Sequence, residues 1–157
     1  MYWRIGPEYH KRARQKNSAL RRIVSQGPPP GLLAFYGEQP VGWCQLTARQ
    51  DLSWLNRKPA LEAVDDTPVW SISCFYVRRS YRKKGVMASL IREALKTAKR
   101  ANVPAVEAYP VDTTRPGSTS NVFTGTASTF RRLGFRTIAR RQLSRPIMRH
   151  DLKGIAC

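Results

Sequence analysis

The stretch that decides the fold reads Val69-Trp70-Ser71-Ile72-Ser73-Cys74-Phe75-Tyr76-Val77-Arg78-Arg79-Ser80-Tyr81-Arg82-Lys83-Lys84-Gly85-Val86-Met87-Ala88. Its first nine residues are apolar, aromatic or small, which predicts a strand over 69–77. A basic loop over 78–84 follows and ends at Gly85. An apolar stripe of helical spacing begins at Val86, with lysines and arginines off the stripe, and predicts a helix that stops at Asn102 and Pro104. The unit is therefore strand, basic turn, glycine and helix.

A glycine turn that enters a helix is suited to binding an anion. The first amides of a helix have no partner within it, and the helix dipole places about half a positive charge at that end. Gly85 lets a phosphate approach the backbone, and Arg82, Lys83 and Lys84 add full charges. The turn matches neither the GxxxxGK[ST] phosphate loop nor the GxGxxG dinucleotide loop. A solvated basic turn before a helix fits equally well, so these residues alone leave both interpretations open.

Further elements are predicted on both sides of this unit. Before it, the sequence predicts a helix over 7–25, a hairpin of strands over 32–36 and 41–47, and a polar, acidic excursion over 48–67. After it come a strand over 105–109, a loop over 110–124, a short helix over 126–133, and strands over 136–140 and 146–151.

Length and composition bound the class of protein. The chain has 157 residues, of which 41% are hydrophobic, and this fits one domain over residues 1–157. No run approaches the roughly 18 apolar residues that a membrane helix needs. Cys44, Cys74 and Cys157 are isolated from one another, so we expect no disulfide framework and no CxxC metal pair. Such sparse cysteine use favours a reducing, cytoplasmic compartment.

The charge is strongly basic and unevenly distributed. Lys and Arg number 28 against 10 acidic residues, a net charge of +18. Residues 31–70 are the exception, with three basic and five acidic side chains. A basic balance attracts phosphates, on a nucleic acid or on a phosphorylated cofactor, but it is also found on solvated surfaces with no such partner.

The basic turn resembles the coenzyme A-binding motif of the GNAT superfamily of N-acetyltransferases. That motif reads Q/R-x-x-G-x-G/A, and the turn matches it at Arg82 and Gly85 but departs from it at Met87. Arg131-Arg132-Leu133-Gly134-Phe135 resembles the later GF signature of the family, and the order of elements is similar over about residues 31–150. The resemblance implies an α/β (α+β) fold with a mixed, mostly antiparallel, splayed sheet flanked by helices. Only residues 1–5 remain for the first strand of the family.

The resemblance also implies where acetyl-CoA binds. It would lie between two diverging strands, 70–77 and 105–109. In the family, backbone groups of the first strand hold the pantetheine arm and polarise the thioester carbonyl, and Phe75, Tyr76 and Val77 match that place. The backbone that matches the pyrophosphate cradle is that of Arg82, Lys83, Lys84, Gly85, Val86, Met87 and Ala88. The implied reaction is direct attack of an amine on the thioester, without an enzyme nucleophile, aided by backbone donors and alignment.

The proton donor for the departing thiolate is less clear from the sequence. Many family members place a Tyr four residues before the Gly of the GF signature, and Phe130 stands there. We expect Phe130 beside the cofactor, although it has no proton to give. Ser128 is our candidate substitute, with Thr129, Ser120 and Tyr109 as alternatives. Each of these also fits a capping or solvated role, and the thiolate can also leave unaided, since ordinary thiols have a pKa of about 8.5.

Acidic residues supply the candidates for a general base. Glu107, on the second splayed strand, is our candidate, and Asp112, Asp65 and Asp66 are alternatives. In so basic a protein, each of these carboxylates could instead serve only as the partner of an arginine or lysine in a salt bridge.

The acidic stretch predicts the acceptor site. We expect Trp54, Asp65 and Asp66 to bind the acceptor, because an acidic mouth suits a cationic amine. The favoured function is acetyl-CoA-dependent acetylation of a primary amine on a small molecule, by a monomer or homodimer without a metal. The alternatives are acetylation of an RNA-borne amine such as an aminoacyl-tRNA, acetylation of a protein amine, and a non-catalytic nucleic-acid-binding domain.

Overall fold

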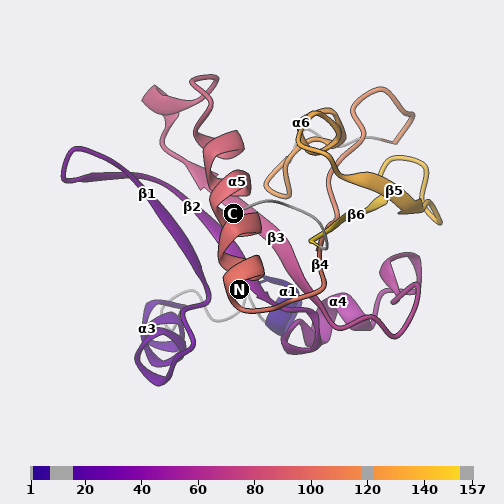
Figure 1. Ribbon diagram of the computed structural model, residues 1–157, viewed down its shortest axis with the longest axis horizontal. Helices are drawn as coiled ribbons and strands as arrows, with labels where there is room; N and C mark the ends of the chain where they lie inside the picture. Colours follow the sequence, from indigo (N-terminus) through magenta and orange to yellow (C-terminus); the bar gives the residue numbers. More distant parts are fainter. Residues whose placement is uncertain (1, 8–15, 118–121, 153–157) are drawn as a thin grey trace.

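The computed structural model describes residues 2–7, 16–117 and 122–152 (Figure 1). A six-stranded sheet has the strand order β1-β2-β3-β4-β6-β5. Its strands are β1 (Gly31–Tyr36), β2 (Gln39–Ala48), β3 (Val69–Val77), β4 (Ala105–Ala108), β5 (Arg136–Ala139) and β6 (Ile147–Asp151). The α-helices are α1 (Tyr2–Ile5), α3 (Lys16–Gln26), α4 (Ser53–Asn56), α5 (Val86–Arg100) and α6 (Ala127–Arg132). The pair β3–β4 is parallel and the other neighbours are antiparallel, which confirms a mixed, mostly antiparallel sheet.

The predicted elements around the decisive stretch are confirmed. β3 has the predicted bounds, and α5 begins at Val86 as predicted and ends at Arg100. The predicted helix over 7–25 is found as α3, which begins at Lys16; Pro7 lies in a turn, and residues 8–15 lie outside the described part of the chain. Tyr2–Ile5 form the short helix α1, not the first strand that the family resemblance suggests.

The splay of the sheet lies between β3 and β4. These strands pair over four positions, from Val69 opposite Ala105 to Ile72 opposite Ala108. β3 then continues to Val77 without β4 beside it. On the other side of β3, the register with β2 shifts between Cys74 and Ile72, which makes Ser73 the extra residue of a β-bulge. A bulge bends its strand, so the backbone of β3 turns away from β4 where pairing ends.

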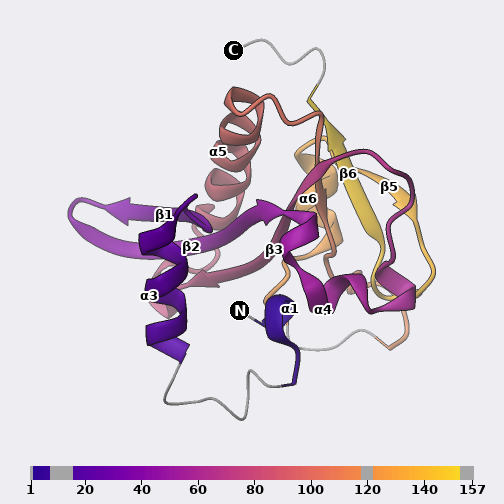
Figure 2. The same cartoon turned by 90° about the horizontal axis from the view of Figure 1, so that it is seen from below.

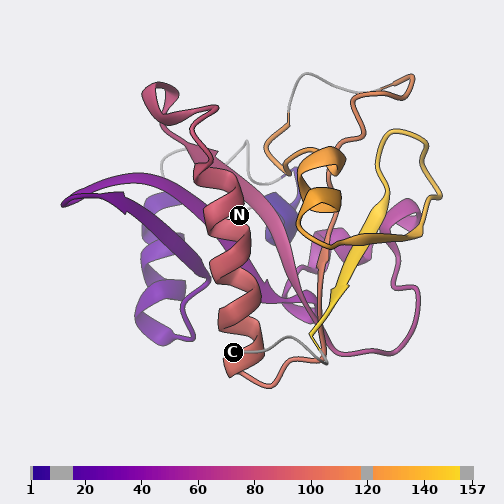
Figure 3. The same ribbon diagram turned by 45° about the horizontal axis from the view of Figure 1, so that its top comes forward.

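Two apolar clusters cover the two faces of the sheet. α5 lies on one face and packs through Leu90, Ile91, Ala94, Leu95 and Ala98, the apolar stripe that the sequence predicts. α6 joins the same cluster through Ala127 and Phe130. Figure 2 shows α1 and α4 on the face opposite α5, and Figure 3 shows α5 and α6 together in front of the sheet.

The acidic excursion is more ordered than its composition suggests. It contains α4 and two 3-10 turns, at Arg49–Asp51 and Pro59–Leu61. Three leucines among its polar residues, Leu52, Leu55 and Leu61, are buried against Trp3, Tyr109 and Ile147. The segment is therefore a packed cover on one face of the sheet, because these leucines bury apolar area that a solvated loop would leave exposed.

Candidate active site

A cleft of about 770 Å³ opens where β3 leaves β4. It brings together the end of β3, the basic turn, the start of α5 and one side of α6. Its walls are Phe75, Tyr76, Val77, Tyr81, Arg82, Lys83, Gly85, Val86, Met87, Ala88, Val122, Phe123, Thr126, Thr129 and Arg132. Nine of the eleven cofactor-binding residues that the sequence predicts therefore meet in one cavity, and its size suits a small-molecule ligand.

The turn into α5 presents free backbone amides to this cleft. Gly85 precedes the helix in a left-handed conformation with φ +81°, and Lys83 has φ +60°. The first helical hydrogen bond runs from the Ser89 amide to the Gly85 carbonyl, so the amides of residues 86–88 have no helical partner. A Cβ on Gly85 would meet no protein atom within 4 Å, so the space beside this glycine is open. The geometry fits a bound diphosphate.

The basic side chains of the turn differ in role. Arg82 donates from Nε to the Val77 carbonyl at 3.1 Å and so ties the turn to the end of β3. Lys83 lines the cleft with Arg82. Lys84 does not line it: its Nζ lies 5.5 Å from the centroid of the Tyr81 ring, on the exposed outside of the turn.

The backbone of β3 at the splay is hydrogen-bonded by groups from outside the sheet. The Phe75 amide donates to the Phe123 carbonyl at 2.6 Å. The Trp3 indole donates from Nε1 to the Ser73 carbonyl at 3.0 Å. Phe123 also packs near Tyr2 and Trp3, with ring centroids 6.5 and 6.4 Å away. Neither α1 nor Phe123 carries a signal in the sequence for this position, because both reach β3 only through the tertiary fold.

Phe130 does not line the cleft, contrary to the sequence prediction. It is fully buried beneath it, between Phe75 and Phe135, with ring centroids 6.1 and 4.9 Å away. Gly125, with φ +80°, lies so close that a Cβ there would be 3.0 Å from the Phe130 ring. The aromatic ring is therefore part of the core that supports the cleft.

The hydroxyl side chains of α6 divide between the cleft and solvent. Ser128, our candidate proton donor, is exposed and contacts Thr126 Oγ1 at 3.2 Å. Thr129 is buried, lines the cleft, and its Oγ1 lies 3.0 Å from Thr126 Oγ1. Thr126, Thr129 and Arg132 recur at helical spacing, so the sequence itself carries a signal that these three side chains share one side of α6. Ser120 lies outside the described residues.

Glu107 is enclosed by arginines and does not face the cleft. Its Oε2 accepts from Arg49 Nη1 and from the Tyr109 hydroxyl, both at 3.1 Å. Its Oε1 accepts from Arg149, at 3.1 Å from Nε and 2.8 Å from Nη2. Only 1% of its surface is exposed. A general base needs a lone pair that can reach the substrate proton, and in this arrangement both carboxylate oxygens of Glu107 are occupied and neither lines the cleft.

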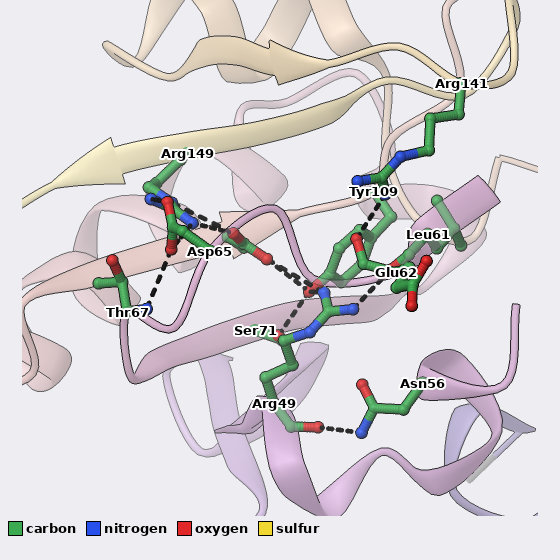
Figure 4. A network of polar contacts seen from close by, with 11 residues as sticks. Arg49, Asn56, Leu61, Glu62, Asp65, Thr67, Ser71, Tyr109, Arg141 and Arg149 are labelled. Atoms are coloured by element: carbon green, nitrogen blue, oxygen red, sulfur yellow. Dashed lines mark hydrogen bonds and ion pairs between the residues drawn. The ribbon is translucent and has the colours of Figure 1, made fainter. Parts of the chain in front are cut away.

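Tyr109 belongs to the same buried network, part of which Figure 4 shows. Its hydroxyl lies 2.7 Å from Arg49 Nη1 and 2.8 Å from Ser71 Oγ. Burial raises the pKa of this phenol, so it stays protonated, but its hydroxyl is already shared among Arg49, Ser71 and Glu107. The network joins the acidic excursion to β3, β4 and β6.

Asp65 and Asp66 lie around a second cavity, of about 640 Å³. Asp65 is held by Arg149 at 2.7 and 2.9 Å, and these hydrogen bonds lower the pKa of its carboxyl. This cavity also includes Trp70 at the start of β3, whereas the cleft begins at Phe75. Five residues of strand span roughly 16 Å. The predicted acidic acceptor mouth is therefore not at the splay.

Trp54 and Asp112 also take structural positions. The Trp54 ring packs against the backbone of Gly6, so closely that a Cβ added to Gly6 would clash with the ring. On the same ring, Lys58 Nζ lies 4.6 Å from the centroid. It lines neither of the two cavities described here. Asp112 accepts from Arg140 Nη2 at 3.0 Å and from Thr114 Oγ1 at 2.8 Å, so its carboxylate is occupied.

Comparison with known proteins identifies the family. The model of the "Acetyltransferase (GNAT) family" matches residues 1–120. The PaiA N-acetyltransferase from Thermoplasma acidophilum, solved in complex with coenzyme A, is 18% identical, with a TM-score of 0.57 over 92% of this chain and 76% of that one. A second structure, described as an acetyltransferase, is 13% identical, with a TM-score of 0.63 over 94% and 86%. A search of curated protein sequences found no match.

A third similar structure is the ribosomal-protein-S18-alanine N-acetyltransferase from Escherichia coli, at 12% identity and a TM-score of 0.52 over 87% of this chain and 78% of that one. At such identities these structures show a shared fold. The chain belongs to the GNAT acetyltransferase family, because the family model covers most of its length. It is an acyltransferase, and its acyl donor is acetyl-CoA. None of the described helices is long and apolar enough to cross a membrane.

The buried network yields a stability prediction. Glu107→Ala removes the carboxylate that Arg49 and Arg149 share, and should lower the free energy of unfolding by about 3–5 kcal/mol, because one partner of a buried ion pair is left uncompensated. Urea unfolding measures this change. Glu93→Ala is the control, since it removes an exposed ion-paired carboxylate and should shift the midpoint little. Equal midpoint shifts for both variants would contradict a stabilising network.

Proposed function

We propose that this protein transfers an acetyl group from acetyl-CoA to a primary amine of a small molecule, directly, in a complex that holds both substrates. The observation that carries the proposal is the cleft itself. It joins the end of a strand that has no β4 beside it, a glycine turn whose first helical amides have no helical partner, and basic side chains. None of its described lining residues is Asp, Glu, Cys or His. Such a site can bind and orient an anionic donor but offers no carboxylate, thiol or imidazole that would activate or act as a nucleophile, which suits direct transfer.

The residues of the chain divide the binding task along the cleft. The amides of residues 86–88, with Arg82 and Lys83, take the diphosphate. The backbone of Phe75, Tyr76 and Val77 takes the pantetheine arm. Bound acetyl-CoA supplies an activated thioester carbonyl. In the free protein the Phe75 amide donates to the Phe123 carbonyl. When the Phe123 carbonyl moves away, this amide can donate instead to the thioester carbonyl and polarise it.

A small acceptor is supported by the packing at the acyl end of the cleft. Tyr2, Trp3 and Phe123 pack together beside Ser73 and Phe75, on the face of the sheet opposite α5. A small amine needs less displacement of these rings than a chain end of a protein or RNA. The free thiols of Cys44 and Cys74 support a reducing, cytoplasmic setting.

We assign the proton donor to Thr129. Its hydroxyl lines the cleft and contacts the Thr126 hydroxyl, so a proton given to the departing sulfur can be replaced along this pair. No carboxylate among the described residues lines the cleft, so the attacking amine binds unprotonated or loses its proton to water.

The cradle is tested by Gly85→Val. A side chain at φ +81° is strained and projects into the open space where the diphosphate binds, so the dissociation constant for acetyl-CoA should rise at least about tenfold, as measured by calorimetry. Gly37→Val is the matched control, because Gly37 has φ +58° and equally open surroundings in the hairpin turn, away from the cleft. Both variants should lose about 1–2 kcal/mol of stability. Unchanged affinity in Gly85→Val would place the cradle elsewhere.

The proton donor is tested by two neighbouring hydroxyls. Thr129→Val should lower kcat at least about tenfold with little change in acetyl-CoA affinity, because the hydroxyl acts only as charge develops on sulfur. Ser128→Ala should leave kcat unchanged, since Ser128 faces solvent. Release of free thiol measures both. A loss of kcat in Ser128→Ala alone would make Ser128 the proton donor, as the sequence predicts. Full activity in both variants would mean that water protonates the thiolate.

A further inference from the structure

Arginines that are buried or half-buried in this protein are paired with carboxylates, with one exception. Among the described residues, Arg4 lies 3.9 Å from Asp51, Arg49 lies 3.1 Å from Glu107, Arg140 lies 3.0 Å from Asp112, and Arg149 lies 2.7 Å from Asp65. Arg145 is half-buried as well, yet no Asp or Glu in the described part of the chain forms an ion pair with it.

The contacts of Arg145 satisfy only part of its guanidinium group. Nη1 donates to the Tyr109 carbonyl at 2.8 Å and to Thr124 Oγ1 at 2.9 Å. Both acceptors are neutral, and neither Nε nor Nη2 bonds to a described residue. Burial lowers the pKa of this guanidinium, and the nearby Tyr2 side chain acts in the opposite direction, while Nε and Nη2 keep some accessible surface. An unpaired charge in such a place is costly, and a bound anion would offset the cost.

Arg145 does not line the cleft, but its hydrogen-bond partners connect it to the end of the cleft formed by Phe75 and Phe123. Tyr109 directly follows β4, at the point where β4 has separated from β3. Thr124 directly follows Phe123, whose carbonyl holds the Phe75 amide. Since consecutive Cα atoms lie about 3.8 Å apart, the guanidinium is within a few residue widths of the amide that we assign to the thioester carbonyl.

The free edge of the guanidinium suits one kind of anion. Nε and Nη2 lie side by side and can donate two parallel hydrogen bonds to the two oxygens of a carboxylate. The anionic parts of acetyl-CoA are assigned to the turn before α5, and Arg145 does not line that part of the cleft. An anion that pairs with Arg145 would therefore come from the other substrate.

We propose that Arg145 binds a carboxylate of the acceptor, and that the acceptors of this enzyme are amines that carry a carboxylate, such as free amino acids. This inference rests on the proposed function, because it names the substrate class of the same site. It also reverses the electrostatic expectation from the sequence: the acidic residues 65 and 66 lie at the far end of β3, and the splay holds an unpaired cation instead.

The test uses matched pairs of acceptors. The panel consists of the free amino acids, their amides and the corresponding decarboxylated amines, with thiol release as the readout. The wild-type enzyme should have the higher kcat/KM for the acid of each active pair. Arg145→Gln should lower kcat/KM for the acid about 10- to 100-fold, the range for a hydrogen bond to a charged group, and leave the amide unchanged. Arg145→Lys keeps the charge but lacks the two parallel donors, so its kcat/KM for the acid should lie between those of the wild-type enzyme and Arg145→Gln.

Two controls separate recognition from folding. Arg141→Gln removes the same charge from the same β5–β6 connection, but Arg141 is exposed and, within the described part of the chain, its side chain donates to the Glu62 carbonyl alone, so acid and amide should be affected equally little. Thermal unfolding of Arg145→Gln should show a modest loss of stability, because the substitution removes the two hydrogen bonds to the Tyr109 carbonyl and Thr124 Oγ1, and this loss affects acid and amide acceptors equally.

Several outcomes decide between the inferences. Equal activity of the wild-type enzyme on acids and amides, or an equal loss on both in Arg145→Gln, overturns the role of Arg145 and leaves the proposed acetyltransferase function standing. If no amine in the panel releases thiol, the proposed function fails. Calorimetry with N-acetylglycine and N-acetylglycinamide, in the presence of coenzyme A, then decides the inference alone. Tighter binding of the acid that disappears in Arg145→Gln supports it, and equal binding refutes it.

Discussion

Beyond Ile72 and Ala108, two neighbouring strands separate, and their backbone groups lose the partners that a continuous sheet would give them. Buried amides and carbonyls must find other partners, since an unpaired one costs about as much as a lost hydrogen bond. Much of the structure around the cleft follows from this requirement. The Trp3 indole bonds to the Ser73 carbonyl and the Phe123 carbonyl to the Phe75 amide, and these contacts bring α1 and residues 122–126 to the same place. The same backbone groups are the ones that a pantetheine arm would use, so the free protein holds its own substitutes for substrate contacts.

The second constraint is the balance of charge inside a strongly basic protein. With 28 basic and 10 acidic residues, carboxylates are scarce, so one buried carboxylate can pair with more than one arginine. Glu107 serves two arginines, and Asp65 bonds again to one of them. The consequence is that the acids that look catalytic in the sequence are structural in the fold. They hold the cover formed by residues 48–68 against the start of β3 and β4. Arg145 has no such carboxylate partner among the described residues, and in our proposal a carboxylate of the acceptor takes that place.

The cleft itself relies on shape and backbone more than on reactive side chains. Its diphosphate end combines a left-handed glycine, helix amides without partners and exposed cations, while its acyl end has backbone donors and aromatic walls. Because a thioester is already activated, such a site has only to orient the amine and to stabilise charge on the carbonyl oxygen and on sulfur. The buried Phe130 has no proton to give, so in this cleft the proton comes from another donor or from water.

The sequence by itself determined the parts of this protein that depend on local order. The strand over 69–77, the glycine turn at Gly85, the apolar stripe of α5 and the family to which they point could all be predicted, because periodicity, charge and turn chemistry act over a few neighbouring residues. The tertiary structure alone decided which side chains share a site. Whether Glu107 is a base or an ion-pair partner depends on Arg49 and Arg149, which are 58 and 42 residues away in the chain. Whether Ser128 or Thr129 faces the cleft depends on how α6 is rotated against Phe75 and Phe135. Such contacts join distant segments, and no local pattern records them, since burial and the pairing of charges are properties of the packed chain as a whole.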